Sequence, residues 1–157
     1  MSLIERIEKV GDAKVWYDDI PIENEYTVGI AGERFLRTLK DRGVITGTLC
    51  PNCDLTYVPP SMYCERCFTQ LDQWVEVPPT GVVETFTVLT RSLEGEPLDE
   101  LQVLAVIRLE GAHGGLVHRL GEISPEEVEI GMAVEAVLKP ASERQGSILD
   151  IEHFRPV

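Results

Sequence analysis

The chain of 157 residues has the length of one large domain or two small ones, and its hydrophobic fraction of 43% is typical of a globular protein. Its 27 acidic residues outnumber 14 basic ones, for a net charge of −13, and this excess along the whole sequence argues against a surface that binds nucleic-acid phosphates. No apolar run approaches the length of a membrane span and no secretory signal is recognisable, so we expect a cytoplasmic protein with neither a membrane nor a nucleic-acid partner.

Residues 1–43 are predicted to form an N-terminal arm followed by a helix. Residues 1–22 allow two interpretations, an arm that packs on another chain or a strand that covers the chain's own domain. Residues 27–42 are predicted to be helical, because their apolar side chains recur at helical spacing and a glycine follows where helices commonly end. The apolar positions are Ala31, Phe35, Leu36 and Leu39, and the glycine is Gly43.

Residues 44–77 contain all four cysteines of the chain, in two C-x-x-C pairs with ten residues between them. Each short turn directs two sulfurs at one point, which is the pattern of a closed tetrahedral zinc site. Two disulfides would need an oxidising compartment, and a redox C-x-x-C would need to open a helix in a βαβ unit. We therefore predict a rubredoxin-like zinc ribbon with a structural Zn²⁺. Its ligands are Cys50, Cys53, Cys64 and Cys67.

A run of turn formers at Pro78-Pro79-Thr80-Gly81 marks a boundary, and residues 81–157 are rich in predicted strands. The strands are expected over residues 82–89, 101–109, 116–120, 132–138 and 147–154. A capping box that begins at Ser124 predicts one helical turn between the third and fourth strands. Five strands with a short helix in this place are the layout of an OB-fold, a small Greek-key β-barrel. The predicted fold class is therefore α+β, with a helical segment, a zinc ribbon and a C-terminal OB-fold barrel.

The sequence offers no self-sufficient catalytic site. None of His113, His118 and His153 lies near a cysteine at ligand spacing, and no cysteine outside the two pairs could act as a nucleophile. The glycine-containing run at residues 111–115 has the spacing of neither a P-loop nor a dinucleotide-binding loop. We expect no catalytic residue in this chain.

Several segments, in one order along the chain, resemble a known family. They are Tyr26–Leu36 in the helix, Gly47–Cys53, Tyr57–Pro60 and Cys64–Cys67 in the ribbon, and Gly81–Val88 and Ile130–Val134 in the barrel. Together they are similar to the zinc-ribbon plus OB-fold accessory proteins called domain of unknown function thirty-five. The resemblance extends from about Tyr26 to Phe154, and it implies that the four cysteines are the metal ligands.

The resemblance also implies a partner. Members of this family are similar to small subunits of thiolase-superfamily enzymes, in which the large subunit carries the nucleophilic cysteine and acts on CoA thioesters. The chain is accordingly expected to be a non-catalytic subunit that shapes or gates the acyl-CoA site of a thiolase-like partner and stabilises that partner. A CoA thioester would then be bound together with the partner. The run from Ala31 to Phe35 most resembles subunits of thiolases for aromatic acyl-CoAs.

The apolar face of the predicted helix is larger than a small ribbon could cover. Because large apolar patches on soluble chains commonly mark interaction sites, we expect Phe35, Leu36 and Leu39 to dock on the partner. On this interpretation neither the ribbon nor the barrel depends on the helix for its core.

Two alternative functions remain open. A free-standing acyl-CoA-binding protein would need basic contacts for the CoA phosphates, and residues 81–157 offer only 6 basic side chains beside 14 acidic ones. A nucleic-acid-binding ribbon and barrel would need stacking aromatics with Lys and Arg. The barrel segment has only Phe86 and Phe154 as aromatics, which makes this second alternative the weaker of the two.

Overall fold

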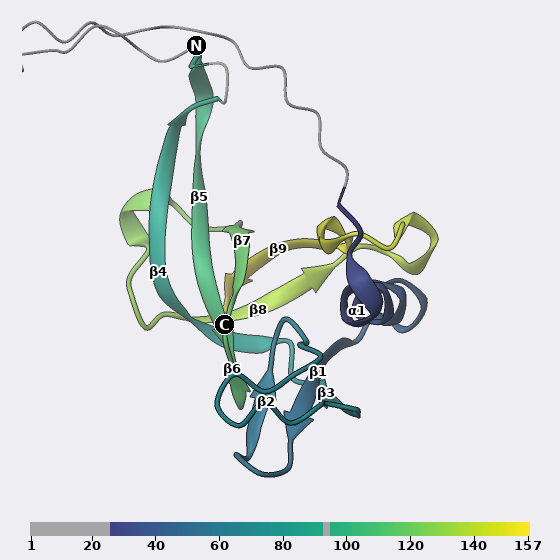
Figure 1. The fold of residues 1–157 in the computed structure, drawn as a ribbon. Helices are drawn as coiled ribbons and strands as arrows, with labels where there is room; N and C mark the ends of the chain where they lie inside the picture. The colour runs from purple at the N-terminus through teal and green to yellow at the C-terminus, as the bar shows by residue number, and fades with distance from the viewer. Residues whose placement is uncertain (1–25, 93–94) are drawn as a thin grey trace, which may run out of the picture.

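The computed structural model describes residues 26–92 and 95–157 and confirms the α+β fold class (Figure 1). The prediction for residues 1–22 lies outside the described residues. One helix leads into a small antiparallel sheet, and a strand-rich barrel follows. Within the described ranges, no helix is long and apolar enough to cross a membrane.

Helix α1 spans Gly29–Arg42 and ends as the sequence predicts. Gly43 adopts a left-handed conformation with φ 66°, which a residue without Cβ accepts readily, and its N–H donates to the Leu39 carbonyl at 3.0 Å. The helix begins two residues later than predicted, because the Thr27 hydroxyl accepts a hydrogen bond from the Gly29 N–H at 2.9 Å and holds the chain in a turn.

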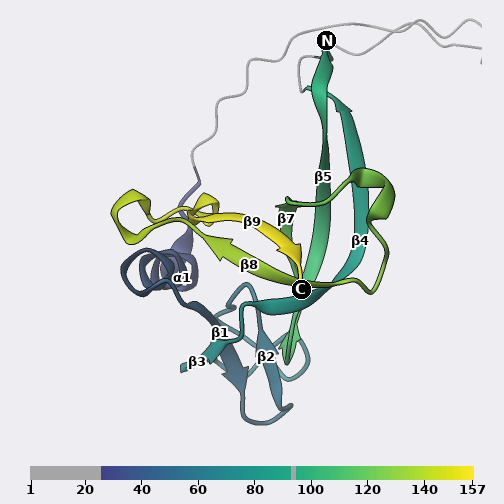
Figure 2. The same cartoon turned by 180° about the vertical axis from the view of Figure 1, so that it is seen from behind.

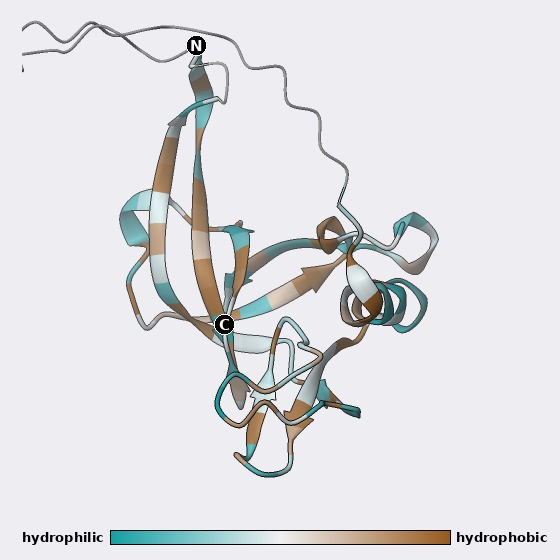
Figure 3. Ribbon diagram, viewed as in Figure 1, coloured by the Kyte–Doolittle hydropathy of each residue, from teal (hydrophilic) through white to brown (hydrophobic). Residues whose placement is uncertain are grey.

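The inner face of α1 is part of the chain's own core. Phe35 is 4% exposed and Leu39 is fully buried, and both belong to the same apolar cluster as the barrel residues Val83, Ile107 and Phe154. The hydrophilic residues of the helix lie on the side away from the barrel (Figure 3). Leu36 is partly buried and packs against the same cluster. The prediction that Phe35, Leu36 and Leu39 dock on a partner is therefore wrong. It failed because the helix covers the junction of ribbon and barrel, which offers more apolar surface than the ribbon alone.

The ribbon is a four-stranded sheet in the order β3-β1-β2-β6. Its first three strands pair antiparallel, whereas β6 comes from the loop after β5 and pairs parallel with β2. A Cβ added at Gly47 in β1 would lie 2.6 Å from the Tyr57 carbonyl oxygen, so this close approach of two strands requires glycine. The strands span Ile45–Cys50 (β1), Leu55–Tyr57 (β2), Gln73–Val77 (β3) and Ala112–His113 (β6).

The remaining five strands follow one another in a closed order, β4-β5-β7-β9-β8, which is the barrel predicted from the sequence. Closure between β7 and β9 rests on a single residue pair, Leu120 with Phe154, so the barrel is nearly open there. The predicted helical turn is present as the 3₁₀ turn η2 at Pro125–Glu127, with the capping box at Ser124. The strands span Thr80–Arg91 (β4), Pro97–Leu109 (β5), Leu116–Leu120 (β7), Ala133–Leu138 (β8) and Ile151–Pro156 (β9).

The last predicted strand begins later than expected. Residues 147–150 form a capping box and a 3₁₀ turn, η4 (Ile148–Asp150), and β9 starts only at Ile151. The Asp150 side chain is almost fully buried and accepts backbone N–H bonds from Gln145 at 2.9 Å, Gly146 at 2.7 Å and Ser147 at 3.3 Å. The turn therefore forms around this carboxylate, which competes successfully with the strand propensity of its neighbours.

The buried Asp150 carboxylate should make part of the stability pH-dependent. Burial alone would raise its pKa, but the N–H bonds from Gln145, Gly146 and Ser147 together hold the pKa below the ordinary value of 3.8. The contribution of the ionised Asp150 carboxylate to the free energy of unfolding is therefore complete above pH 3.8. It is lost as the pH falls through that value toward the lower pKa of the folded state.

We expect Asp150→Asn to lower the free energy of unfolding by about 2 kcal/mol at pH 7, since an amide cannot replace three charge-assisted acceptor contacts. Urea unfolding of both proteins between pH 7 and pH 3 should show this difference shrinking below pH 3.8. Asp72→Asn, at an exposed position, is the matched control and should have little effect. A difference that stays constant with pH would contradict the assigned role.

Candidate metal centre

The structure brings together all four residues that the sequence predicts as metal ligands. The Sγ atoms of Cys50, Cys53, Cys64 and Cys67 all lie within 4.8 Å of one another. Cys50 and Cys64 are fully buried, whereas Cys53 is half-buried and Cys67 is exposed. None of them forms a disulfide in the structure. Four sulfurs at this spacing form a donor set that fits a tetrahedral zinc ion.

The two cysteine pairs lie on turns of the same shape. In the first turn the Asp54 N–H donates to the Cys50 carbonyl at 2.9 Å, and in the second the Phe68 N–H donates to the Cys64 carbonyl at 2.9 Å. Asp54 and Phe68 both have positive φ, of 53° and 56°. Each turn reverses the chain tightly and so holds both of its sulfurs on the side that faces the other turn.

Two hydroxyl groups that the sequence analysis did not identify contact the second cysteine pair. The Tyr57 hydroxyl lies 3.2 Å from the Cys64 Sγ and accepts a hydrogen bond from the Glu65 N–H at 3.3 Å. The Thr69 hydroxyl lies 3.3 Å from the Cys67 Sγ. Hydroxyl protons directed at thiolates would stabilise the charged form that binds a metal.

The pKa values of the four thiols follow from these contacts. The Tyr57 hydrogen bond lowers the pKa of Cys64 to about 6, and the Thr69 hydrogen bond lowers the pKa of Cys67. The side-chain contact with Cys67 raises the pKa of Cys53 to about 12, and burial raises the pKa of Cys50. The pKa values of the second pair are thus lowered and those of the first pair are raised, and a cation among the four sulfurs would favour the thiolate form of all of them.

The cysteine turns are anchored to the barrel through β6. The Val58 N–H donates to the His113 carbonyl at 3.0 Å, and the rings of Tyr57 and His113 meet edge to face with centroids 5.3 Å apart. The Tyr57 side chain, which contacts Cys64, is therefore held directly by β6, the short strand that follows the barrel strand β5. A change at the metal centre would reach the barrel through this contact.

The other histidines lie in the barrel, away from the cysteines. His118 is 5% exposed and packs edge to face on Phe154, with ring centroids 5.8 Å apart. His153 lies 3.1 Å from the Glu122 carboxylate. In the described part of the chain, the four cysteines are the one cluster of side chains close enough to share a metal.

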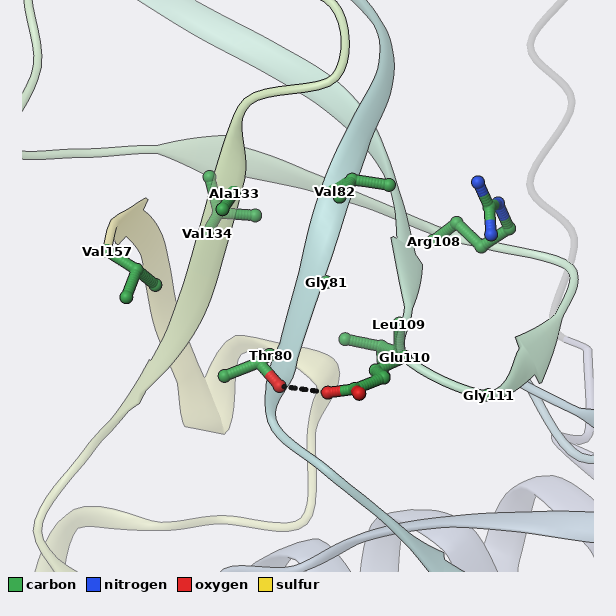
Figure 4. Close-up of a pocket in the computed structure, with 10 residues that line it drawn as sticks. All are labelled: Thr80, Gly81, Val82, Arg108, Leu109, Glu110, Gly111, Ala133, Val134 and Val157. Atoms are coloured by element: carbon green, nitrogen blue, oxygen red, sulfur yellow. Dashed lines mark hydrogen bonds between the residues drawn. The ribbon is translucent and has the colours of Figure 1, made fainter.

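An apolar groove of about 500 Å³ is lined mainly by residues of β4, β5 and β8 (Figure 4). Its charged residues are already engaged, because Arg108 pairs with Glu84 at 2.6 Å and Glu110 accepts a hydrogen bond from the Thr80 hydroxyl at 3.2 Å. A groove with one neutralised cation favours apolar groups over the phosphates of a nucleotide.

Comparisons with known proteins agree with both halves of the fold. A family model for the rubredoxin-like zinc ribbon domain of ChsH2 matches residues 37–72, and one for the C-terminal OB-fold domain of ChsH2 matches residues 74–139. Among solved structures, a DUF35-family protein of unknown function from Sulfolobus solfataricus has a TM-score of 0.61 and 30% identity, over 69% of this chain and 78% of that one.

The Ltp2-ChsH2(DUF35) aldolase also has a TM-score of 0.61, covering 84% of this chain and 98% of the matched one, but at 24% identity the likeness shows the fold alone. Among curated proteins, a DUF35 domain-containing scaffold protein from Methanocaldococcus jannaschii is 30% identical over 128 residues, which are 79% of this chain and 89% of that protein. With the ribbon, the barrel and a relative matched over nearly its whole length, the chain belongs to the DUF35 family.

Proposed function

We propose that this chain is a non-catalytic accessory subunit of a thiolase-like enzyme that acts on CoA thioesters. The observation that carries the proposal is the match to a scaffold protein over 89% of that protein's length, with both halves of the fold included. The name of the Ltp2-ChsH2 aldolase describes an assembly of a related fold with a second protein, which is consistent with an accessory role. Shaping the acyl-CoA site and stabilising the partner are the tasks proposed for the chain.

In this proposal Cys50, Cys53, Cys64 and Cys67 hold a structural zinc ion. Their four sulfurs would fill a tetrahedral coordination shell and leave no position for substrate, so the metal stabilises the ribbon rather than activating water or a carbonyl group. Tyr57 and Thr69 orient and stabilise the second pair of thiolates.

The partner would contact the exposed apolar surface at the start of α1, formed by Tyr26, Val28 and Ile30. Tyr26 is 86% exposed, Val28 is 59% exposed and Ile30 is 73% exposed, so three large apolar side chains within five residues face solvent. These residues do not belong to the chain's core, in contrast to Phe35 and Leu39 on the other face of the same helix. A cluster of this kind, rather than an isolated exposed side chain, is typical of an interaction surface.

The acyl-CoA itself would be bound mainly by the partner. The apolar groove in Figure 4 has its one arginine paired to Glu84, so it lacks the free cations that the CoA phosphates require. This disfavours a free-standing acyl-CoA carrier. The similarity of the Ala31–Phe35 run to subunits of aromatic acyl-CoA thiolases makes aromatic acyl-CoAs the first substrates to test.

Co-purification with the tagged full-length chain tests the proposal. We expect a thiolase-superfamily chain, identified by mass spectrometry, in the purified complex, and turnover of acyl-CoA by the complex but not by the isolated chain. Recovery without any thiolase-like chain, or turnover by the rigorously isolated chain, would show that the proposed function is wrong.

The contact surface is tested separately with Ile30→Asp, which places a charge on the exposed surface at the start of α1 and should prevent co-purification while zinc content and folding are retained. Val117→Asp is the matched control, because Val117 is 67% exposed on the barrel strand β7. If Val117→Asp disrupts the complex and Ile30→Asp does not, the partner contacts the barrel and the assigned surface is wrong.

A further inference from the structure

The β4–β5 hairpin extends beyond the barrel as a two-stranded arm (Figures 1 and 2). Strand β8 pairs with β4 only at Thr80–Val82, and β7 pairs with β5 only at Val103–Ile107. Val83 exchanges further backbone hydrogen bonds with the β7–β8 loop, and beyond it the outer edge of β4 has no backbone partner among the described residues. A hairpin of two strands is marginally stable in water on its own, so this arm would gain from additional pairing.

The two edges of the arm differ in charge. The β5 edge carries Asp99 and Glu100, both exposed, and charged side chains of this kind prevent edge-to-edge pairing. The β4 edge at Thr85–Leu89 carries no charge and consists of residues that favour strands. Register shifts between Val83 and Thr85 and between Leu89 and Arg91 bound this regular stretch, so that Thr87 lies at its centre.

The regular stretch is complementary to itself. In an antiparallel pair centred on Thr87, Thr85 lies opposite Leu89 of the other copy, and Phe86 lies opposite its Val88. Phe86 and Val88 are both half-buried on the face that packs against the core, so they would extend one apolar face across the pair.

The outer face would bring Thr87 against its own counterpart, a favourable cross-strand pair. Beyond each end of the stretch stand charges of opposite sign, Glu84 and Arg91. Glu84 already pairs with Arg108 of its own chain at 2.6 Å, and Arg91 donates to the Gly95 carbonyl at 2.8 Å. Antiparallel pairing places the Glu84 end of one copy beside the Arg91 end of the other, so that like charges do not meet as they would in a parallel pair.

We propose that β4 is a dimerisation edge, on which a second copy of this chain pairs antiparallel through Thr85–Leu89. The two arms would then form one four-stranded antiparallel sheet. The charge pattern favours a second copy as the occupant, because the stretch is neutral within a chain of net charge −13 and its two ends avoid contact between like charges when the second copy runs antiparallel. Repulsion between the two acidic copies predicts that the dimer strengthens as salt is added. The arm lies away from α1 in both views, so the proposal does not depend on the accessory role (Figures 1 and 2).

Sedimentation equilibrium of the full-length, zinc-loaded chain tests this proposal. The wild type is expected to be dimeric at micromolar concentration, and Thr87→Lys to be monomeric there, since two lysines would face each other at the centre of the interface. Gln102→Lys is the matched control, because Gln102 pairs with Leu89 on the same face of the arm but lies on the β5 edge. It should remain dimeric.

Cross-linking tests the register. Thr87→Cys should form an interchain disulfide under mild oxidation with zinc retained, whereas Gln102→Cys should not. A wild type that is monomeric at all concentrations, or a dimer that survives Thr87→Lys, would overturn the proposal. Cross-linking of Thr87→Cys to a different protein in the purified complex, without a homodimer, would also overturn it and assign the edge to that protein.

Discussion

Replacing Cys64 by serine is expected to reduce the bound zinc from close to one ion per chain to close to zero. Cys64 is fully buried, and its sulfur lies 3.2 Å from the Tyr57 hydroxyl, so the change removes a ligand and one anchor of the ribbon. Among residues 26–92 and 95–157, the local core around the cysteines has Cys50, Tyr57, Cys64 and Leu71 as its buried members, too few to hold residues 50–71 without a metal.

Elemental analysis and hydrogen exchange would measure this effect. We expect exchange protection to be lost across residues 50–71, whereas the barrel keeps a cooperative but weakened unfolding transition, because β6 joins the two parts. Tyr57→Phe is the matched comparison, since it removes the hydroxyl and keeps the ring, and it should retain zinc with lower affinity. Wild-type protein without zinc, or a fully protected Cys64→Ser ribbon, would contradict the zinc assignment.

The cysteine turns could be predicted from the sequence because their information is local. Two C-x-x-C pairs constrain four sulfurs regardless of the rest of the chain, and the structure places those sulfurs within 4.8 Å of one another. The hydroxyl contacts of Tyr57 and Thr69 could not be predicted in the same way. Tyr57 reaches Cys64 only because β2 pairs with β1 and β6 and directs its side chain into the turn, and spacing along the chain does not reveal that geometry.

The presence of five barrel strands was likewise predictable, since apolar, strand-favouring runs bounded by turn formers mark each strand along the sequence. Two features depended on tertiary structure instead. Asp150 replaces the start of the last strand by a turn, because its carboxylate accepts three backbone N–H groups. The apolar periodicity of α1 correctly predicted a helix, but its apolar face was wrongly assigned to a partner, since periodicity identifies a buried face without identifying what buries it.

The last prediction concerns the packing of α1 against the ribbon and barrel of its own chain. Leu39→Ala is expected to lower the free energy of unfolding by about 3 kcal/mol, because Leu39 is fully buried where the helix, the ribbon and the barrel share one cluster. Phe35→Asp should prevent folding altogether, since it would bury a carboxylate without a partner in the same cluster. Both effects would appear in the isolated chain, before any partner is added.

Ile30→Ala is the matched control on the same helix. Ile30 is 73% exposed, so its truncation should change the free energy of unfolding by less than about 0.5 kcal/mol. Urea unfolding of the zinc-loaded wild type, Leu39→Ala and Ile30→Ala would distinguish the two faces of α1. The inner face is expected to stabilise the fold, and the outer face is expected to be free for a partner. Equal, small effects of Leu39→Ala and Ile30→Ala, together with loss of partner binding in Leu39→Ala, would show instead that the inner face is the interface. The chain's own barrel would then have to close without the helix, although its residues at η3 (Ala141–Glu143) and η4 pack directly against α1.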